Sequence, residues 1–445
     1  MKNTFKRIFA LLLALVMVLS LAACGGASAP AEEAPKAETP KAEAPKAEEP
    51  AKAAPTEVEL WHYFDSSNDR DLIDQWVEEY NGLQDDIHIT SIYVSRPELI
   101  NQYIIGAVSG ELPDIGMCDS PEMASYISLG VFEDITEQLN AWGEVDKFYP
   151  GPLSSCMDPE GNLYGLPQNS NCLCLAVNMD LLAAAGYTEA PDSLDELLEI
   201  AKATTNPADS VYGMAMCCIS TEEGTFQMLP WLRSVVDGVG VNVDNLTAPS
   251  AVAGLSALAE LINSGSMSKE CVNWTQADAW TQFCTGKAAM AEIGTWHLAM
   301  TNEMTEEFNY EIVLLPTGAE GTSTSTIGGE NFGVCTGAAD VDGCVEFLKW
   351  MCSKDNSKEW AENAGKIPTR VDSEAVYTYE VEGFATFVDE MNYAQARGPH
   401  AEWPTISEAI YTATQSVFLN GVDPADALAT AMETIAPIVA ENPLP

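Results

Sequence analysis

The stretch VELWHYFDSSNDRDLIDQWVEEYNGLQDDIHITSIYV at residues 58–94 passes from one hydrophobic periodicity to another and back. Apolar and polar residues alternate over Val58–Tyr63 and again over Ile87–Val94, which predicts two strands. Between them, apolar residues recur at helical spacing and predict a helix over Asp69–Tyr80. This part of the chain therefore has the pattern strand, helix, strand.

The pattern continues downstream, with a helix predicted over Glu98–Ser109 and a short buried strand over Asp114–Cys118. A β-α-β-α-β order implies an α/β fold with a largely parallel sheet and helices on both faces. The ligand crevice of such a sheet lies beyond the carboxyl ends of its strands. At these ends stand four candidates for ligand binding: His62, Tyr63, Asp119 and Ser120.

The first 24 residues have the pattern of a signal peptide that ends in cysteine. A basic start precedes the apolar run Ile8–Leu19 and then Leu21-Ala22-Ala23-Cys24. The run is too short for a permanent transmembrane helix. The pattern resembles a bacterial lipobox, which implies that residues 1–23 are removed and that Cys24 is acylated at the outer face of the cytoplasmic membrane. The alternative is an ordinary signal peptide followed by an incidental cysteine.

A low-complexity segment follows Cys24. Residues 25–56 contain no aromatic residue and no aliphatic residue larger than alanine, and Pro-Lys-Ala-Glu recurs from Pro35, Pro40 and Pro45. Such a segment buries too little apolar surface to offset its chain entropy. We therefore expect residues 24–56 to be a disordered, extended tether between the lipid anchor and the folded part.

The folded remainder is too long for one ordinary core, so two lobes are expected. The formal charge of the whole chain is −47, and removal of Lys2, Lys6 and Arg7 makes it −50 (−47 − 3). A field of that sign repels phosphate backbones and argues against a nucleic-acid partner. Neutral or cationic small molecules remain, although much of the acidity serves the solubility of an exported protein.

The chain has 12 cysteines, but their spacing does not indicate a metal site. Segments such as Leu173-Cys174-Leu175 place cysteine in apolar surroundings, where it behaves as a small hydrophobic residue. Paired CxxC units are absent, and the four histidines have no metal-binding spacing. Mostly free, buried thiols are the expectation, with disulfides left open.

Several short motifs resemble the extracellular solute-binding proteins of carbohydrate ABC importers. They lie in family order over residues 58–440: Gly110-Glu111-Leu112-Pro113-Asp114-Ile115, Tyr164-Gly165-Leu166-Pro167, Leu175-Ala176-Val177-Asn178-Met179-Asp180, Leu194-Asp195-Glu196-Leu197, Phe283-Cys284-Thr285-Gly286-Lys287-Ala288-Ala289-Met290, Gly294-Thr295-Trp296, Leu315-Pro316, Gly328-Gly329, Ile367-Pro368-Thr369-Arg370 and Asn420-Gly421-Val422-Asp423-Pro424. The sequence departs from the family at the start of the helix at Leu194, where it reads Ala190-Pro191-Asp192-Ser193-Leu194 and the family commonly has Pro-x-Thr-Trp. That departure weakens the match at one helix start.

The resemblance implies a two-lobed periplasmic-binding-protein fold of the maltodextrin-binding type, with a ligand cleft between the lobes. It places the amino lobe at residues 57–171 and 297–336, and the carboxyl lobe at 172–296 and 337–445. It also implies a monomer that delivers a carbohydrate to the transmembrane subunits of a permease, with no catalytic step and no cofactor.

A sugar site needs flat aromatic faces and side chains that both donate and accept hydrogen bonds. The aromatic candidates are Trp231, Trp296 and Trp403, of which Trp296 carries over from the family's glycine-x-tryptophan element. The polar candidates are Asn169, Glu330, Asn331, Arg370 and Arg397. Core packing is the alternative for each tryptophan, capping for the asparagines and salt bridges for the arginines.

Two alternative functions remain at this point. Paired carboxylates in a sugar cleft are the machinery of glycoside hydrolysis, and 67 acidic residues supply many pairs, but no familiar catalytic motif is present. The second alternative keeps the fold and changes the ligand to a cation such as a polyamine, held by aromatic faces and carboxylates.

Overall fold

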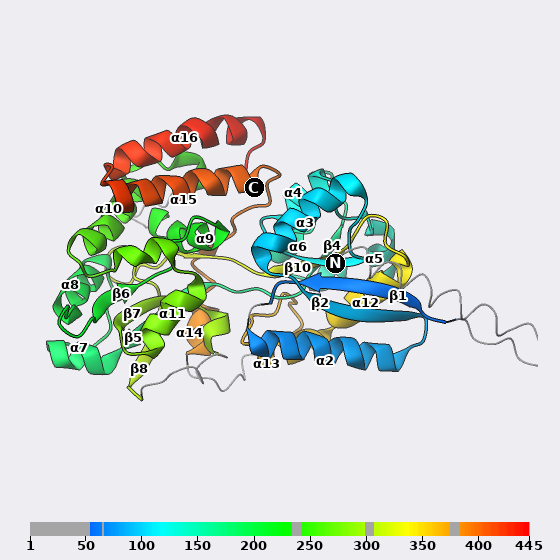
Figure 1. The fold of residues 1–445 in the computed structure, drawn as a ribbon, viewed down its shortest axis with the longest axis horizontal. Helices are drawn as coiled ribbons and strands as arrows, with labels where there is room; N and C mark the ends of the chain where they lie inside the picture. The colour runs from blue at the N-terminus through cyan, green and yellow to red at the C-terminus, as the bar shows by residue number, and fades with distance from the viewer. Residues whose placement is uncertain (1–53, 65, 234–241, 299–306, 374–382, 445) are drawn as a thin grey trace, which may run out of the picture. The chain divides into compact units, whose positions relative to one another are not determined.

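The computed structural model describes residues 54–64, 66–233, 242–298, 307–373 and 383–444 (Figure 1). The predicted signal peptide, Cys24 and the tether up to residue 53 lie outside these ranges. The described residues belong to one compact unit, Ala54–Pro445, that contains two main sheets. We call the first sheet with its helices the amino lobe and the second the carboxyl lobe.

The amino lobe is built on a five-stranded sheet in the order β2-β1-β3-β10-β4. Strands β1 (Thr56–His62), β2 (Ile87–Tyr93) and β3 (Ile115–Asp119) are parallel, as the alternation predicts. Strand β10 (Glu330–Val334) joins from far along the chain and runs antiparallel to both β3 and β4 (Gly165–Pro167).

Helices cover both faces of this sheet, with α2 (Ser67–Leu83) on one side and α3 (Arg96–Ser109) on the other (Figure 1). The Ser66 side chain accepts a hydrogen bond from the Asp69 amide and so caps α2, while Gly110 ends α3 in the left-handed conformation. The remaining helices of this lobe are α4 (Met123–Ser128), α5 (Thr136–Trp142), α6 (Pro150–Ser154), α12 (Val341–Met351) and α13 (Lys354–Ala364).

The carboxyl lobe is built on a four-stranded sheet in the order β6-β7-β5-β8. Its strands are β5 (Leu173–Asn178), β6 (Tyr212–Ala215), β7 (Ala288–Gly294) and β8 (Tyr310–Val313). Its helices are α7 (Met179–Ala185), α8 (Leu194–Thr204), α9 (Glu222–Leu232), α10 (Pro249–Asn263), α11 (Gln276–Cys284), α14 (Phe384–Glu390), α15 (Trp403–Asn420) and α16 (Pro424–Glu441). The fold class is therefore the predicted two-lobed α/β arrangement.

The structure differs from two of the predicted lobe boundaries, those at 296/297 and 336/337. Strand β8, expected in the amino lobe, pairs with β5 in the carboxyl sheet. Helices α12 and α13, expected in the carboxyl lobe, belong to the amino lobe because their aromatic side chains complete its core. Trp360 lies 5.0 Å from Trp76, and Phe347 lies 5.0 Å from Tyr80, between ring centroids.

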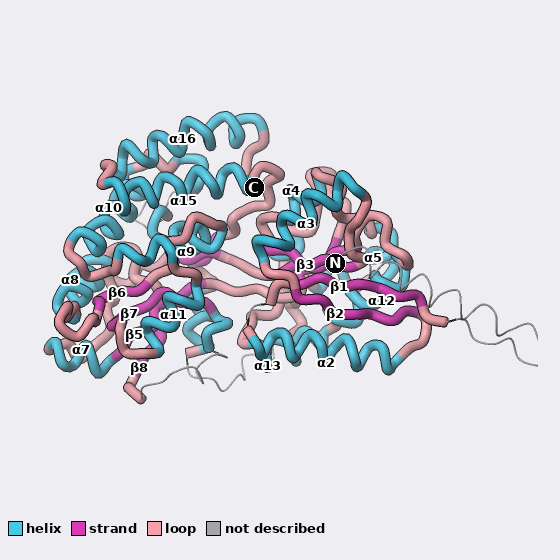
Figure 2. Tube along the Cα trace, viewed as in Figure 1, coloured by secondary structure: helices cyan, strands magenta, loops and turns pink. Residues whose placement is uncertain are grey.

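Loop segments lie between the two lobes (Figure 2). Residues 168–172 lead from β4 to β5, residues 327–329 lead into β10, and residues 365–373 follow α13. Bridges join Asn171 to Gly328 and Ser170 to Ile367, so the first segment contacts both others. We call these three segments the crossings.

Three further findings concern the cysteines, the helices and the metal-ligating side chains of the described ranges. Every one of the eleven cysteines in the described ranges is buried, and no disulfide joins any of them. Within the same ranges no helix is long and apolar enough to cross a membrane, and no cluster of side chains is suited to a metal ion.

Candidate ligand-binding cleft

A cavity of about 660 Å³ lies between the two lobes beside the crossings. That volume is within the usual range for small-molecule sites. Amino-lobe and crossing residues contribute Tyr63, Phe64, Ser66, Asp69, Arg96, Asp119, Asn171, Gly329, Glu330 and Lys366 to its wall. The carboxyl lobe contributes Glu223, Phe226, Thr275, Gln276, Ala277, Thr281, Trp296 and His297, and Arg397 reaches it from the segment before α15. We call this cavity the cleft.

The amino-lobe wall follows from the order of the strands. Tyr63 comes directly after β1 and Asp119 ends β3, and these two strands are parallel neighbours, so their carboxyl ends meet at one edge. Glu330 begins β10 and pairs with Asp119 across the antiparallel ladder. Tyr63, Asp119 and Glu330 therefore lie together in the wall of the cleft.

The aromatic wall of the carboxyl lobe comes from the turn after β7. Trp296 is partly exposed, and its ring centroid lies 6.2 Å from that of Phe226. Gly294 must lack a side chain, because a Cβ there would meet the Trp296 ring at 2.1 Å. The Gly294 amide donates to Nδ1 of His297 at 3.0 Å, which holds the turn. Burial lowers the pKa of His297 to about 3, so its imidazole is neutral near pH 7.

A chain of buried ion pairs crosses the cleft from one lobe to the other. Arg397 donates through Nη1 to Glu222 at 2.6 Å and through both Nη atoms to Asp119, at 2.6 and 2.8 Å. Arg96 donates through Nη2 to the same Asp119 at 2.8 Å and to Glu122 at 3.2 Å. We call these five residues the charge network. Glu222 begins α9 and Asp119 ends β3, so Arg397 joins the two lobes.

The network sets the ionisation of its carboxyl groups. Burial by itself would raise the pKa of Asp119, but Arg397 and Arg96 outweigh burial and hold that pKa below its usual range. Burial raises the pKa of Glu122 to about 7, with nearby Asp119 and Glu222 acting in the same direction. Asp119 is therefore an anion shared by two guanidinium groups, whereas Glu122 titrates near neutrality.

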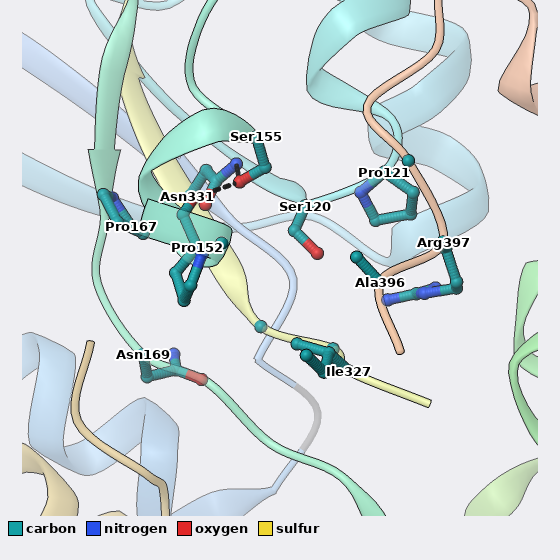
Figure 3. Close-up of a pocket in the computed structure, with 14 residues that line it drawn as sticks. Ser120, Pro121, Pro152, Ser155, Pro167, Asn169, Ile327, Asn331, Ala396 and Arg397 are labelled. Atoms are coloured by element: carbon teal, nitrogen blue, oxygen red, sulfur yellow. Dashed lines mark hydrogen bonds between the residues drawn. The ribbon is translucent and has the colours of Figure 1, made fainter. Parts of the chain in front are cut away.

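A second, small cavity of about 30 Å³ adjoins the cleft, and three more of the predicted residues line it (Figure 3). Ser120, Asn169 and Asn331 line it together with Pro121, Pro152 and Pro167. Asn331 donates to the Ser155 hydroxyl at 2.8 Å. This volume suits a water molecule rather than a sugar ring. Gly329 and Arg397 line both cavities.

Four predicted site residues line neither of the two cavities. Trp231 is fully buried inside α9, where its Nε1 donates to Glu292 at 2.9 Å, and Trp403 is fully buried at the start of α15. His62 is buried under the sheet edge and accepts from the Phe64 amide through Nδ1 at 3.3 Å. Arg370 is buried in the amino lobe.

Arg370 is fully engaged where it lies. It donates to Glu144 at 2.7 Å, to Asp372 at 2.9 Å and to the Cys352 carbonyl at 3.1 Å. The two tryptophans are therefore core residues, and Arg370 forms salt bridges, as the alternatives given for them state. The prediction that these three residues and His62 line the cleft is corrected.

Sequence reasoning missed several residues of the cleft wall, among them Phe64, Arg96, Phe226, Gln276 and Lys366. Phe64 follows the predicted pair His62 and Tyr63 by one residue, so a wider window at the end of β1 finds it. Arg96 and Lys366 carry no local signal. Their ion-pair partners lie far away in the sequence. Nη2 of Arg96 is 2.8 Å from Asp119, and Nζ of Lys366 is 3.7 Å from Asp69.

Two α/β lobes joined by three crossings, with a charged and aromatic cleft between them, define a ligand-binding protein of the two-lobed solute-binding class. The model of the family "Bacterial extracellular solute-binding protein" matches residues 75–383, and the chain belongs to this family. It is a family of solute-binding proteins rather than enzymes.

The chain is also similar, at low sequence identity, to individual known proteins. The chain is 23% identical to the maltotriose-binding protein of Pyrococcus abyssi over 159 residues, which is 36% of this chain and one third (33%) of that protein. It is 23% identical over 339 residues to the sn-glycerol-3-phosphate-binding periplasmic protein UgpB of Pectobacterium atrosepticum, covering 71% of this chain and 73% of that protein. The solved structure of maltose-bound MalE3 of T. maritima superposes with a TM-score of 0.73 at 23% identity, covering 85% of this chain and 98% of that one.

Proposed function

We propose that this protein is the extracellular substrate-binding component of an ABC importer and that its cargo is a mono- or oligosaccharide. The observation that carries the proposal is the cleft, which combines aromatic faces with many polar side chains in a cavity of about 660 Å³. A sugar ring presents an apolar face of C–H groups and a rim of hydroxyls, and both need a partner.

The residues proposed to bind the sugar come from both lobes. Trp296 and Phe226 supply aromatic faces from the carboxyl lobe, and Tyr63 supplies one from the amino lobe. Glu330 and Asn171 supply acceptors for sugar hydroxyls beside the crossings. A ligand that contacts both walls at once binds the closed arrangement more tightly and shifts the population towards it.

The maltotriose-binding relative and the maltose-bound structure support a carbohydrate over other small molecules. The glycerol-3-phosphate-binding relative raises a phosphorylated ligand as the alternative. The cleft argues against it, because each of the three basic side chains in the described wall already contacts a carboxylate. A phosphate group would have to displace one of these pairs or remain unpaired.

We also propose that the mature protein is lipid-anchored through Cys24 and monomeric. The signal pattern at residues 1–24 and the tether composition support the anchor. The anchor would keep the binding protein near the permease subunits to which it delivers the sugar.

The test is a thermal-shift screen followed by calorimetry, using the mature chain with Cys24→Ser so that it stays in solution. Mono- and oligosaccharides are compared with glycerol 3-phosphate, amino acids and polyamines. A ligand that binds the folded state raises the melting temperature. A saturable response to at least one unmodified sugar supports the proposal. A response confined to glycerol 3-phosphate, amino acids or polyamines overturns the sugar assignment.

A further inference from the structure

The cleft carries more negative than positive charge. Its described wall contains the carboxylates of Asp69, Asp119, Glu223 and Glu330 and the cations of Arg96, Lys366 and Arg397. Glu122 and Glu222 lie directly behind the wall, hydrogen-bonded to the same two arginines. The carboxylates therefore outnumber the cations even when Glu122 is counted as neutral.

Each of the three cations in the described wall is already committed to a carboxylate. Arg96 and Arg397 share Asp119. Nζ of Lys366 lies 3.7 Å from Asp69 and 5.3 Å from the centroid of the Trp296 ring, and Lys366 is 3% exposed. An anionic group on a ligand would therefore compete with existing ion pairs.

Some acceptor atoms in the cleft wall, in contrast, have no hydrogen-bond donor. Oε2 of Glu330 and Oδ1 of Asn171 are buried, line the same cleft and have no hydrogen-bond partner. Asn171 is 4% exposed, so its oxygen has little access to water when the cleft is empty. Buried acceptors of this kind are costly until a donor reaches them.

The direction of the pKa shift of Glu330 agrees with an excess of negative charge in the cleft. Burial raises its pKa and nearby Asp119 acts in the same direction, while Lys366 opposes them. The Trp296 and Phe226 rings already have the cations of Lys366 and Arg397 over them, at 5.3 and 4.5 Å from the ring centroids.

From these observations we infer that the preferred cargo is an amino sugar, whose protonated amine binds Glu330 and Asn171 while the sugar ring lies against Trp296. The inference rests on the sugar-binding function proposed above and narrows its substrate class. A hydroxyl has one proton to donate to these acceptors, whereas an ammonium group has three and brings the missing positive charge.

The experiment compares each hexose with its amino counterpart on the mature chain with Cys24→Ser. Calorimetry measures glucose, galactose and mannose against glucosamine, galactosamine and mannosamine, with N-acetylglucosamine and glucuronate as controls. We expect at least one hexosamine to bind about tenfold more tightly than its parent hexose, the difference between a charge-assisted and a neutral hydrogen bond. N-acetylation removes the charge and should abolish the gain, and glucuronate should bind most weakly.

The outcomes separate this inference from the function on which it rests. If neutral hexoses or longer neutral sugars bind as tightly as the hexosamines, or more tightly, the amino-sugar assignment is overturned and the sugar-binding function stands. If no sugar of either kind binds, both are overturned.

The variant Glu330→Gln tests the residue. It should reduce the preference for the hexosamine over its parent hexose from about tenfold to within about twofold. The exposed Glu359→Gln on α13 removes the same charge away from the cleft and should leave the preference unchanged. A full preference in Glu330→Gln, with circular dichroism matching the parent protein, overturns the role of Glu330.

Discussion

Arg397 and Asp119 form a two-point ion pair, at 2.6 and 2.8 Å, although they are separated by 278 positions in the chain and belong to opposite sides of the cleft. Their contact makes the arrangement of the lobes depend on one guanidinium group. Asp119 ends a strand of the amino lobe, and the second partner of Arg397, Glu222, begins a helix of the carboxyl lobe.

Removing this guanidinium should be costly. Arg397→Gln leaves Glu222 buried without its cation and removes one of the two from Asp119, so we expect a loss of about 3 kcal/mol in the free energy of unfolding. Urea denaturation measures it. In a double-mutant cycle, Arg397→Gln with Asp119→Asn should lose less than the sum of the single changes, because the second change removes an uncompensated charge. Strict additivity would show that the pair contributes no coupling.

Two tryptophans should separate binding from folding. Trp296→Ala removes an aromatic face from the cleft and should weaken sugar affinity by about tenfold or more, with little loss of stability. Trp231→Ala leaves a cavity in the carboxyl core and an unpaired Glu292, and should lower the unfolding free energy by about 3–5 kcal/mol. Calorimetry and urea denaturation of both variants give the comparison. Equal sugar affinity in Trp296→Ala and the parent would remove Trp296 from the site.

The pH dependence of stability should reveal the buried carboxyl groups. Burial raises the pKa of both Glu122 and Glu390 to about 7, against an ordinary value of 4.5. In the folded protein both groups hold their proton more tightly than in the unfolded chain, and this difference stabilises the fold. The stabilisation is complete below pH 4.5 and is lost as the pH rises through 7. We expect the unfolding free energy to fall between pH 6.5 and 8.

The range from pH 6.5 to 8 lies above the one in which the buried histidines change stability. Burial lowers the pKa of His62 to about 4 and of His297 to about 3, so their contribution is present above pH 6.5 and is lost below it. Glu390→Gln keeps an acceptor for the Leu315 amide, 2.9 Å from Oε2, and removes the titration. The variant should show a shallower slope between pH 6.5 and 8, by roughly 1 kcal/mol per pH unit at pH 6.5 and less as the pH rises. An unchanged slope would contradict the assignment to Glu390.

The described cysteines should be unreactive in the folded state. Burial raises the pKa of thiols such as Cys118 and Cys172 well above the ordinary value, and the thiolate is the reactive form. We expect slow labelling of these thiols by a thiol reagent in buffer and rapid labelling of all eleven in denaturant, followed by mass spectrometry. Rapid labelling of Cys118 or Cys172 in the native protein would contradict their burial.

Local periodicity was sufficient to predict the first three strands and the first two helices of the amino lobe. The strand predicted over Val58–Tyr63 is observed at Thr56–His62, and the helix predicted over Glu98–Ser109 is observed at Arg96–Ser109. The sequence also placed Tyr63 and Asp119 at one edge, because parallel neighbouring strands leave no other arrangement. These features depend on residues that are close in sequence.

The features that were missed depend on contacts over long separations. Helix α13 joins the amino lobe because Trp360 packs on Trp76, and no local pattern distinguishes that partner from another aromatic residue. Trp231 was a candidate for the sugar site, but it lies with Pro230 inside α9, where every residue except Glu223 is buried. Exposure of a large aromatic side chain is a property of the assembled fold.

The three crossings affect how the chain is made. Neither lobe is a continuous piece of sequence: the amino-lobe sheet needs β10 and its core needs Trp360 from α13. At a synthesis rate of about 5–20 residues per second, the strands of β1 to β3 wait roughly ten seconds or longer for these partners. A nascent chain therefore keeps its first lobe unfinished until most of it has been translated.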